Sequence, residues 1–583
     1  MNPEVGYFPG NKAQNMLNVI RLITENLLDD PQYFCLQAVR KFAKGPQLKR
    51  LEKLRGAPLV AGKIDGLLAL LSEDRVAVSE YITSQKKQWT HSANASRLAN
   101  TAIAAQLWDL ASAILECAPV TEVTARSKAR LDFSMGNLDR AINVLSRSGN
   151  SRSRQLRHYR SELRVLESWN PVASLKERDW ELSGPVRVLY VATNSIPFTA
   201  SGYTQRTHSL LLALKSDNVE VHAATRVGYP LSIGHPLAEG ASVVDGITYH
   251  HLLPANLQFD TAGRIQQQTQ MLSALVEKLK PTILHTTTDF TNALAVRAVA
   301  KSFDLPWVYE VRGQLADTWA STRPASAIES QRYRLFKARE AEMAASASEV
   351  LTLGQAMRKN LEDSGVRPEK ITVIPNGVGK PYTDQPLSAV EARTALGLEP
   401  HAEYFGTVSS LVAYEGLDTL VRVMASLAER RPNLHLLIVG DGVEREVLMR
   451  LAHDLGVGER CIFAGRVSRQ QAAKYHAALD VFAVPRKALS VTRDVTPLKP
   501  VEAMASGVPV LASRLPALEE LIRDNIDGVL VPPEDVMAWS EALEKLLIDP
   551  TLRQHLGQSG RKNVLSDRVW TVCSRKLKGI YSR

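Results

Sequence analysis

The sequence VRVLYVAT at residues 186–193 begins the part of the chain that decides the fold. It is a continuous apolar run with several β-branched side chains, which is typical of a strand buried on both faces of a parallel sheet. A Ser/Gly-containing turn follows, then a predicted helix at about 204–216 and a second predicted strand at 219–225. Because parallel strands need crossover connections, this alternation predicts helices on both faces of the sheet.

The alternation continues through most of the remaining sequence and restarts once. Further strands are predicted at 282–286, 307–311, 349–353 and 371–374 and, after Pro381, at 404–408, 434–439, 461–464, 481–484, 508–512 and 528–531. The pattern predicts two α/β domains with doubly wound parallel sheets, at 183–382 and 383–566. Ligands bind beyond the carboxyl ends of such strands, so the expected site is the cleft between the two domains.

The first third of the chain, residues 1–182, has the spacing of helices rather than strands. Apolar residues recur every three or four positions, for example over 17–27 and 67–71. The segments 107–115 and 135–143 resemble each other at an offset of 28, with small alanines at matching positions. This predicts an all-helical domain that resembles stacked hairpins of the tetratricopeptide kind.

The charge of the protein is concentrated in this first third. The 583 residues carry a net charge of +10, and residues 1–180 alone hold 26 basic and 18 acidic residues. Six arginines lie between 147 and 164, opposed by Glu162 alone. Such a patch fits a membrane surface or an acidic polymer, and equally a solvated helix face. Interleaved aromatic residues are too few for sequence-specific reading of a nucleic acid.

Cysteine usage and hydropathy indicate the compartment. The four cysteines are far apart and follow no metal-ligand spacing, which suits a reducing environment and disfavours a disulfide framework. There is no apolar run of about 18 residues and no signal-peptide pattern in the first ten residues. We therefore expect a cytoplasmic protein, with any membrane contact peripheral at the inner face of the cytoplasmic membrane.

Two segments carry candidate ligand-binding residues. Gly202 lies between the first strand and its helix, where free N–H groups can bind an anion such as a diphosphate. The stretch VPRKALSVTRDVTPLKPVEAMASGVP, residues 484–509, leads from a strand into a helix expected to begin near Pro497. Around that start lie three cations able to neutralise a diphosphate and two carboxylates able to accept hydrogen bonds from sugar hydroxyls, namely Arg486, Arg493 and Lys499, and Asp494 and Glu502.

Several ordered motifs over residues 186–582 together resemble the family 4 retaining glycosyltransferases, which have two facing Rossmann-like domains (the GT-B fold). The motifs are SGYTQRTHSLLLAL at 201–214, YEVRG at 309–313, ITVIPNGV at 371–378, YEGLD at 414–418, HLLIVGDG at 435–442, KPVEAMASGVPVLAS at 499–513 and DGVLVPP at 527–533. The resemblance implies that residues 567–583 form a terminal helix crossing back to the first Rossmann-like domain.

The resemblance also implies roles for individual residues. Glu502 matches the glutamate that holds the nucleotide ribose, and Asp494 stands where the family has a glutamate contacting the donor sugar. His285 is the first member of a His-x-His pair whose second position is Thr287 here. His285 would then contact the donor sugar, or it is a histidine packed within its strand, which the missing second histidine favours. Arg312 would contact donor or acceptor, while Arg486, Arg493 and Lys499 bind the diphosphate. Arg466 and Val467 would lie at the nucleotide base.

The activity implied is transfer of a sugar from a UDP- or GDP-linked donor to a hydroxyl of a glycan or glycolipid in bacterial cell-surface polysaccharide synthesis. No protein nucleophile, no cofactor and no metal ion are expected. The helical domain is expected to dock the acceptor, a membrane or a partner protein. The alternatives are an inactive scaffold, another reaction of the same fold such as a sugar-nucleotide epimerase or a phosphorylase, and a protein-modifying transferase.

Overall fold

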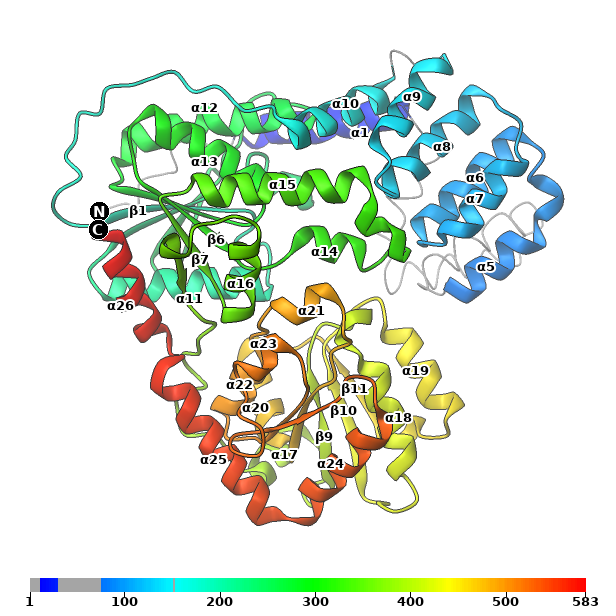
Figure 1. The fold of residues 1–583 in the computed structure, drawn as a ribbon, viewed down its shortest axis with the longest axis vertical. Coiled ribbons are helices and arrows are strands. Elements are labelled where there is room, and N and C mark those ends of the chain that lie inside the picture. The colour runs from blue at the N-terminus through cyan, green and yellow to red at the C-terminus, as the bar shows by residue number, and fades with distance from the viewer. Residues whose placement is uncertain (1–10, 30–74, 150–152) are drawn as a thin grey trace.

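The computed structural model describes residues 11–29, 75–149 and 153–583 (Figure 1). The chain forms three consecutive parts: a helical part, a domain around an eight-stranded sheet and a domain around a six-stranded sheet. The fold class predicted from the sequence is confirmed. Cys35, Arg152 and the predicted helical run at 67–71 lie outside the described residues.

The helical part contains antiparallel helix pairs stacked on one another, together with a first helix that hydrogen-bonds to residues 238–257 of the first Rossmann-like domain. Its helices are α1 (Lys12–Asp29), α5 (Arg75–Ser84), α6 (Ser92–Ala104), α7 (Trp108–Cys117), α8 (Glu122–Ser134), α9 (Leu138–Arg147) and α10 (Arg154–Glu167). α6 packs on α7 and α8, and α8 packs on α9. Helices α8 and α9 begin 30 residues after α6 and α7, so the repeat offset is 30 rather than the predicted 28. Gln106 and Gly136, both with positive φ, occupy equivalent turns.

Four of the six arginines of the arginine-rich stretch lie in α10 and Arg147 ends α9, and part of this charge is used inside the protein. Arg154 is buried, forms an ion pair with Glu25 of α1 at 2.5 Å and lies over the ring of Phe259. Arg157 and Arg164 are exposed. The predicted exposed basic patch therefore includes only some of the arginines of this stretch.

The first Rossmann-like sheet has the strand order β3-β4-β2-β1-β5-β6-β7-β8. Its strands are β1 (Arg187–Ala192), β2 (Glu220–Thr225), β3 (Ala241–Val244), β4 (Ile247–His250), β5 (Ile283–Thr287), β6 (Trp307–Val311), β7 (Glu349–Thr352) and β8 (Ile371–Val373). Pairing is parallel except between β3 and β4, a hairpin that sequence analysis missed. Its Asp245-Gly246 turn, with positive φ at both residues, was a usable signal because such dipeptides favour two-residue hairpin loops.

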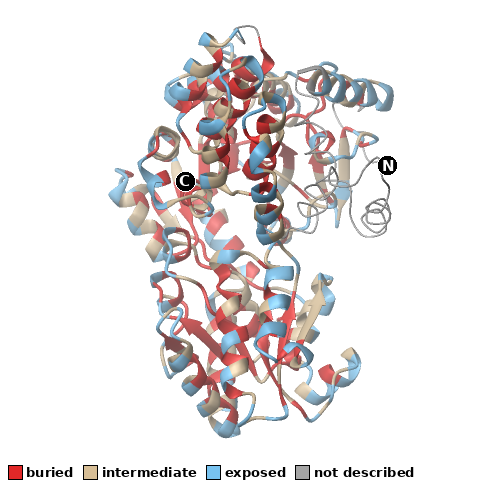
Figure 2. Ribbon diagram, turned by 90° about the vertical axis from the view of Figure 1, so that its right-hand side faces the viewer, coloured by how far each residue is buried: buried red, intermediate tan, exposed pale blue. Residues whose placement is uncertain are grey.

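Helices cover both faces of this sheet, as parallel crossovers require. They are α11 (Gly202–Ser216), α12 (Thr261–Leu279), α13 (Phe290–Ser302), α14 (Leu315–Ala320), α15 (Gln331–Ser346) and α16 (Gln355–Asp363). Figure 2 shows buried strands enclosed by helices whose outer sides are exposed.

The second sheet is entirely parallel, with the order β11-β10-β9-β12-β13-β14. Its strands are β9 (Glu403–Val408), β10 (Leu434–Val439), β11 (Cys461–Gly465), β12 (Val481–Val484), β13 (Val510–Ser513) and β14 (Val529–Val531). The helices are α17 (Ala389–Leu396), α18 (Leu417–Leu427), α19 (Arg445–Asp454), α20 (Arg469–Ala478), α21 (Ser490–Asp494), α22 (Lys499–Ala505), α23 (Pro516–Glu519), α24 (Val536–Ile548) and α25 (Pro550–Asp567). The helix expected near Pro497 begins two residues later, with Pro500 in its first turn.

Helix α26 (Trp570–Tyr581) returns to the first Rossmann-like domain and lies beside α11 (Figure 1). Its buried residues Cys573 and Leu577 belong to the same hydrophobic cluster as Val188 and Tyr190 of β1. The crossing segment is fixed where Val378 pairs with Val569 in an isolated bridge. Among the described residues, no helix is long and apolar enough to span a membrane.

We predict that Leu577→Ala lowers the free energy of unfolding of the first Rossmann-like domain by about 2–5 kcal/mol, because Leu577 is fully buried in that domain's cluster. The measurement is the urea midpoint of the unfolding transition. Lys576→Ala, one residue earlier on the exposed side of α26, is the control and should leave the midpoint unchanged. Equal midpoints for both variants would show that α26 adds no packing energy to this domain.

Candidate functional site

A cleft of about 260 Å³ lies between the two Rossmann-like domains. Both walls come from segments at the carboxyl ends of strands or at helix N-termini, as the topology predicts. The lining residues are Ser201, Gly202, Tyr203, Arg206, Arg312, Leu353 and Asn376 from the first domain and Ser410, Arg486, Val495, Thr496, Pro497, Leu498 and Lys499 from the second. Of the predicted site residues, this cleft brings together Gly202, Arg312, Arg486 and Lys499.

The N-terminus of α11 forms part of the first wall. Ser201 caps this helix, its Oγ accepting from Thr204 N at 3.3 Å, and Gly202 is the first helical residue. A Cβ atom placed on Gly202 would meet no heavy atom within 4 Å, so the space in front of this helix end is open. A helix N-terminus facing a cleft carries partial positive charge and attracts anions.

On the opposite wall two cations surround one carboxylate. Arg486 donates from Nε and Nη2 to Glu415 at 3.2 and 3.0 Å. Lys499 Nζ lies 3.7 Å from Glu415 Oε1 and donates to Ser409 Oγ at 2.7 Å. Burial alone would raise the pKa of Glu415, but Arg486 and Lys499 outweigh it and lower that pKa to about 2. Glu415, within the YEGLD motif, was not singled out from the sequence.

Glu502 lies one helical turn after Lys499 on α22. Burial raises the pKa of its carboxyl group to about 7, although Arg469 and Lys499 act in the opposite direction. Arg469, the first residue of α20, donates across the domain boundary from Nη1 to Gln205 Oε1 at 3.2 Å and to Ser209 Oγ at 3.1 Å. Sequence reasoning missed Arg469, although it is three residues from the predicted Arg466.

Asp494 differs from its predicted position. It ends the short helix α21 rather than lying in a loop, and its Oδ2 accepts from Asn360 Nδ2 of α16 at 2.8 Å. It is not among the residues lining the cleft. The structure therefore joins Asp494 to the first domain instead of pointing it into the cleft. Glu502 is not among the lining residues of the cleft either.

The segment after Asp494 is tied to the first domain as well. Asn376 Nδ2 donates to Thr496 O at 3.0 Å, and Thr496 Oγ1 donates to Glu520 Oε1 at 2.6 Å. The other oxygen of Glu520 accepts from Gln355 N at the start of α16. The two domains are thus in hydrogen-bonded contact at the base of the cleft.

Three further predicted residues lie outside the cleft lining. Arg493 is exposed on α21, so its predicted contact with a diphosphate needs correction: its side chain faces solvent. Arg466 is likewise exposed, and Val467 packs against the hydrophobic core of the second domain. Both follow β11, where the sequence placed them.

The prediction for His285 is also corrected by its position. Its side chain is fully buried in β5, where Nδ1 hydrogen-bonds to the Tyr581 hydroxyl and the ring lies 4.4 Å from that of Tyr190. Burial lowers the pKa of its imidazole group, although Glu310 acts in the opposite direction. Contact with a donor sugar is excluded in this conformation because α26 covers the ring.

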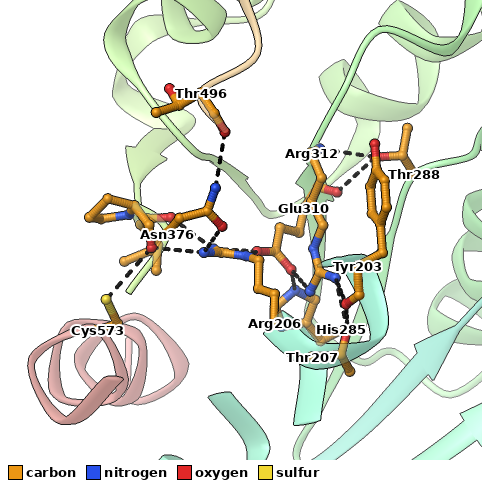
Figure 3. Close-up of polar contacts among 12 residues, drawn as sticks. Tyr203, Arg206, Thr207, His285, Thr288, Glu310, Arg312, Asn376, Thr496 and Cys573 are labelled. Atoms are coloured by element: carbon orange, nitrogen blue, oxygen red, sulfur yellow. Dashed lines mark hydrogen bonds and ion pairs between the residues drawn. The ribbon is translucent and has the colours of Figure 1, made fainter. Parts of the chain in front are cut away.

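Arg312 reaches the edge of the cleft, but both of its terminal nitrogens are already hydrogen-bonded (Figure 3), and its Nε is buried without a partner. It donates to Glu310 Oε2 at 2.5 Å, to Thr207 Oγ1 at 2.7 Å and to Tyr203 O at 3.0 Å. Glu310 is fully buried and also accepts from Arg206 at 2.7 Å. Arg312 therefore positions α11 instead of presenting free donors to a ligand, which corrects its predicted catalytic role.

Both Rossmann-like domains match known family descriptions. Residues 201–377 match "Glycosyl transferase 4-like domain" and residues 390–563 match "Glycosyl transferases group 1". The two-domain part of the chain belongs to the group 1 glycosyltransferase family. Among the residues that the structure describes, no group of three or more His, Cys, Asp or Glu side chains is placed to hold a metal ion.

Curated relatives of these glycosyltransferase domains are similar over part of their length. The chain is 36% identical over 177 residues to the GDP-mannose-dependent alpha-(1-6)-phosphatidylinositol monomannoside mannosyltransferase of Mycolicibacterium smegmatis, covering 30% of this chain and 46% of that protein. It is 29% identical over 224 residues to the D-inositol 3-phosphate glycosyltransferase of Corynebacterium diphtheriae, covering 37% and 51%. The chain thus spans about half the length of the curated relatives it matches.

Solved structures share the two-domain fold. Sucrose-phosphate synthase from Thermosynechococcus elongatus superposes with a TM-score of 0.57 at 21% identity, covering 68% of this chain and 98% of that one. The Anabaena protein HepE in complex with UDP gives 0.53 at 16% identity, covering 68% and 100%. At such identities the similarity is one of fold.

The raised pKa of Glu502 predicts a pH-dependent stability. A carboxyl group with a folded pKa near 7 stabilises the protein below its ordinary pKa of 4.5, and this contribution is lost as pH rises through about 7. In Glu502→Gln that loss is absent. We expect the melting temperature of the variant, relative to the wild type, to increase between about pH 5 and about pH 8. Scanning fluorimetry of the ligand-free proteins checks this, and a difference that is constant with pH would contradict it.

Proposed function

We propose that the protein is a retaining glycosyltransferase that moves a sugar from a nucleotide-diphosphate donor to a hydroxyl of a glycan or glycolipid. The observation that carries the proposal is the pair Lys499 and Arg486 facing the N-terminus of α11 across the cleft. Cations and a helix N-terminus on two sides of one cavity suit a diphosphate. Glu502, one turn beyond Lys499, would accept from ribose hydroxyls.

The donor is proposed to be GDP- or UDP-linked. The names of the mannosyltransferase relatives state GDP-mannose, and the HepE structure contains UDP. A lipid-linked acceptor is supported by the phosphatidylinositol mannoside in the name of the same relatives. Bacterial cell-surface glycan synthesis, at the cytoplasmic side of the membrane with peripheral contact, follows as part of this proposal.

The chemistry assigned to the site needs charge stabilisation more than a protein nucleophile. The C1–O bond to the diphosphate breaks, and a bond forms between C1 and the acceptor oxygen on the same face. The acceptor proton passes to the departing phosphate oxygen, so atoms and charge balance without another reactant. Negative charge grows on the diphosphate, where Lys499, Arg486 and the α11 N-terminus would stabilise it. With these fixed charges we propose catalysis without a metal or cofactor.

Glu415 balances the charge of this site. It pairs with both cations, which avoids the cost of two buried, uncompensated positive charges. A diphosphate would share the donors of Arg486 and Lys499 with Glu415. The carboxylate then orients the two cations from behind, which is a positioning role.

We predict that Lys499→Met lowers kcat for nucleoside diphosphate release by about 10²–10³-fold, because it removes a cation from the leaving diphosphate. The assay follows diphosphate release from GDP-mannose, UDP-glucose and other nucleotide sugars, with and without bacterial membrane extract as acceptor. Lys474→Met, an exposed lysine on α20, is the matched control and should release at the wild-type rate.

The same assay distinguishes the inactive-scaffold alternative, which the hydrogen-bonded position of Asp494 favours. A scaffold releases no diphosphate from any donor in the presence of extract, and its melting temperature does not rise with GDP or UDP. Nucleotide binding without release in extract would contradict the proposed transferase.

A further inference from the structure

A second cavity, of about 210 Å³, lies where the helical part meets both Rossmann-like domains. Its described walls come from α5 and the α6–α7 turn, from Ser321 and Thr322 after α14, and from the segments after β9, β10 and β12. We propose that this cavity holds the aliphatic chain of a lipid-linked acceptor. The inference rests on the proposed function and adds the part of the acceptor that the donor cleft does not explain.

The walls have the chemistry of an aliphatic site. Val78, Ala105, Val412, Val447 and Leu489 supply mostly carbon surface. Val447 and Leu489 are 40% and 38% exposed; Val447 lies in α19, and Leu489 precedes α21. Apolar side chains that converge on one cavity while remaining accessible to water are typical of a site that an apolar ligand fills.

Polar side chains of both charges also line the cavity. They include Arg75, whose side chain donates to Gln106, Lys487 and Glu444. Lys487 is paired with Asp418 at 3.1 Å. A mostly apolar lining with a few charged groups fits an amphiphile, whose chain contacts the carbon surface and whose sugar headgroup contacts the polar side chains.

The cavity and the donor cleft share two segments of chain. Tyr414 and Lys487 line the cavity, while their neighbours Glu415 and Arg486 form the ion pair in the cleft. Lys487 N donates to Tyr414 O at 3.1 Å, and a Cβ on Gly416 would come within 2.0 Å of Pro485 O. These segments are therefore in tight contact, and a chain held in the cavity places its headgroup beside the diphosphate cations.

The helical part is fixed in place to form this cavity. Trp108 Nε1 donates to Thr322 O at 3.1 Å, and Arg323 Nε donates to Ser134 O at 2.6 Å. Without α5 and the α6–α7 turn, the apolar residues of the second domain would form an open slope. The helical part thus completes an acceptor site, which gives a physical reason for its presence ahead of the transferase domains.

The test uses the full chain and hexyl, octyl and decyl glucosides below their critical micelle concentrations, with binding measured by isothermal titration calorimetry. Burial of each methylene contributes about 0.8 kcal/mol, so we expect Kd to fall about three- to four-fold per added methylene until the cavity is filled. Val447→Asp and Leu489→Asp should abolish this dependence on chain length. Both side chains are partly exposed, so the variants are expected to fold.

Val390→Asp on α17 is the matched control. Val390 is 46% exposed in the same domain and does not line the cavity, so its variant should keep the wild-type dependence on chain length. Equal Kd values for all three glucosides, or the same chain-length dependence in all variants, would overturn the proposal. GDP and UDP titrations on the same samples separate the two proposals. Nucleotide binding without alkyl-chain binding would contradict the proposed acceptor site in the cavity and leave the proposed transferase function standing.

Discussion

The carboxylate of Glu310 is the group on which the geometry of the donor cleft depends. It is fully buried at the end of β6 and contacts Arg206, Arg312 and the Tyr190 hydroxyl. Burial would raise its pKa, but the two guanidinium groups hold that pKa well below its usual range. A buried carboxylate left without such partners would cost several kcal/mol. Arg206 also donates to the carbonyls of Ile374 and Pro375, so one charge cluster joins α11, β6 and the interdomain connection.

Both walls of the cleft place two cations around one carboxylate, Glu310 in the first domain and Glu415 in the second. The two pairs differ in what else they bind. Arg206 and Arg312 are 2% exposed and also donate to α11 and to the carbonyls of Ile374 and Pro375. The side chain of Lys499 is 28% exposed, so its charge stays accessible to an anion in the cleft.

The sequence predicted the fold well because its signals are local. Each strand of the second domain was recognisable from a short apolar run such as 434–439, and the place of Gly202, Arg486 and Lys499 at strand ends and helix starts predicted their position in the cleft. The donor-sugar contact of His285 and the catalytic role of Arg312 do not fit the structure because what surrounds these residues comes from distant parts of the chain, whereas the alternative of a packed strand histidine fits His285. Tyr581, almost 300 positions from His285, covers its ring, and no local pattern records such a contact. The second cavity escaped prediction for the same reason, since its walls come from three parts of the chain.

The return of α26 to the first domain has a consequence for the order in which the protein is synthesised. Val188 and Tyr190 of β1 leave the ribosome early, but the cluster they belong to is completed by Trp570, Cys573, Leu577 and Tyr581. Domains often fold as they emerge, amino-terminal domain first. Here the first Rossmann-like domain keeps an incomplete apolar face while the whole second domain is translated. Its nascent form therefore exposes a surface that a chaperone would recognise until α26 closes it.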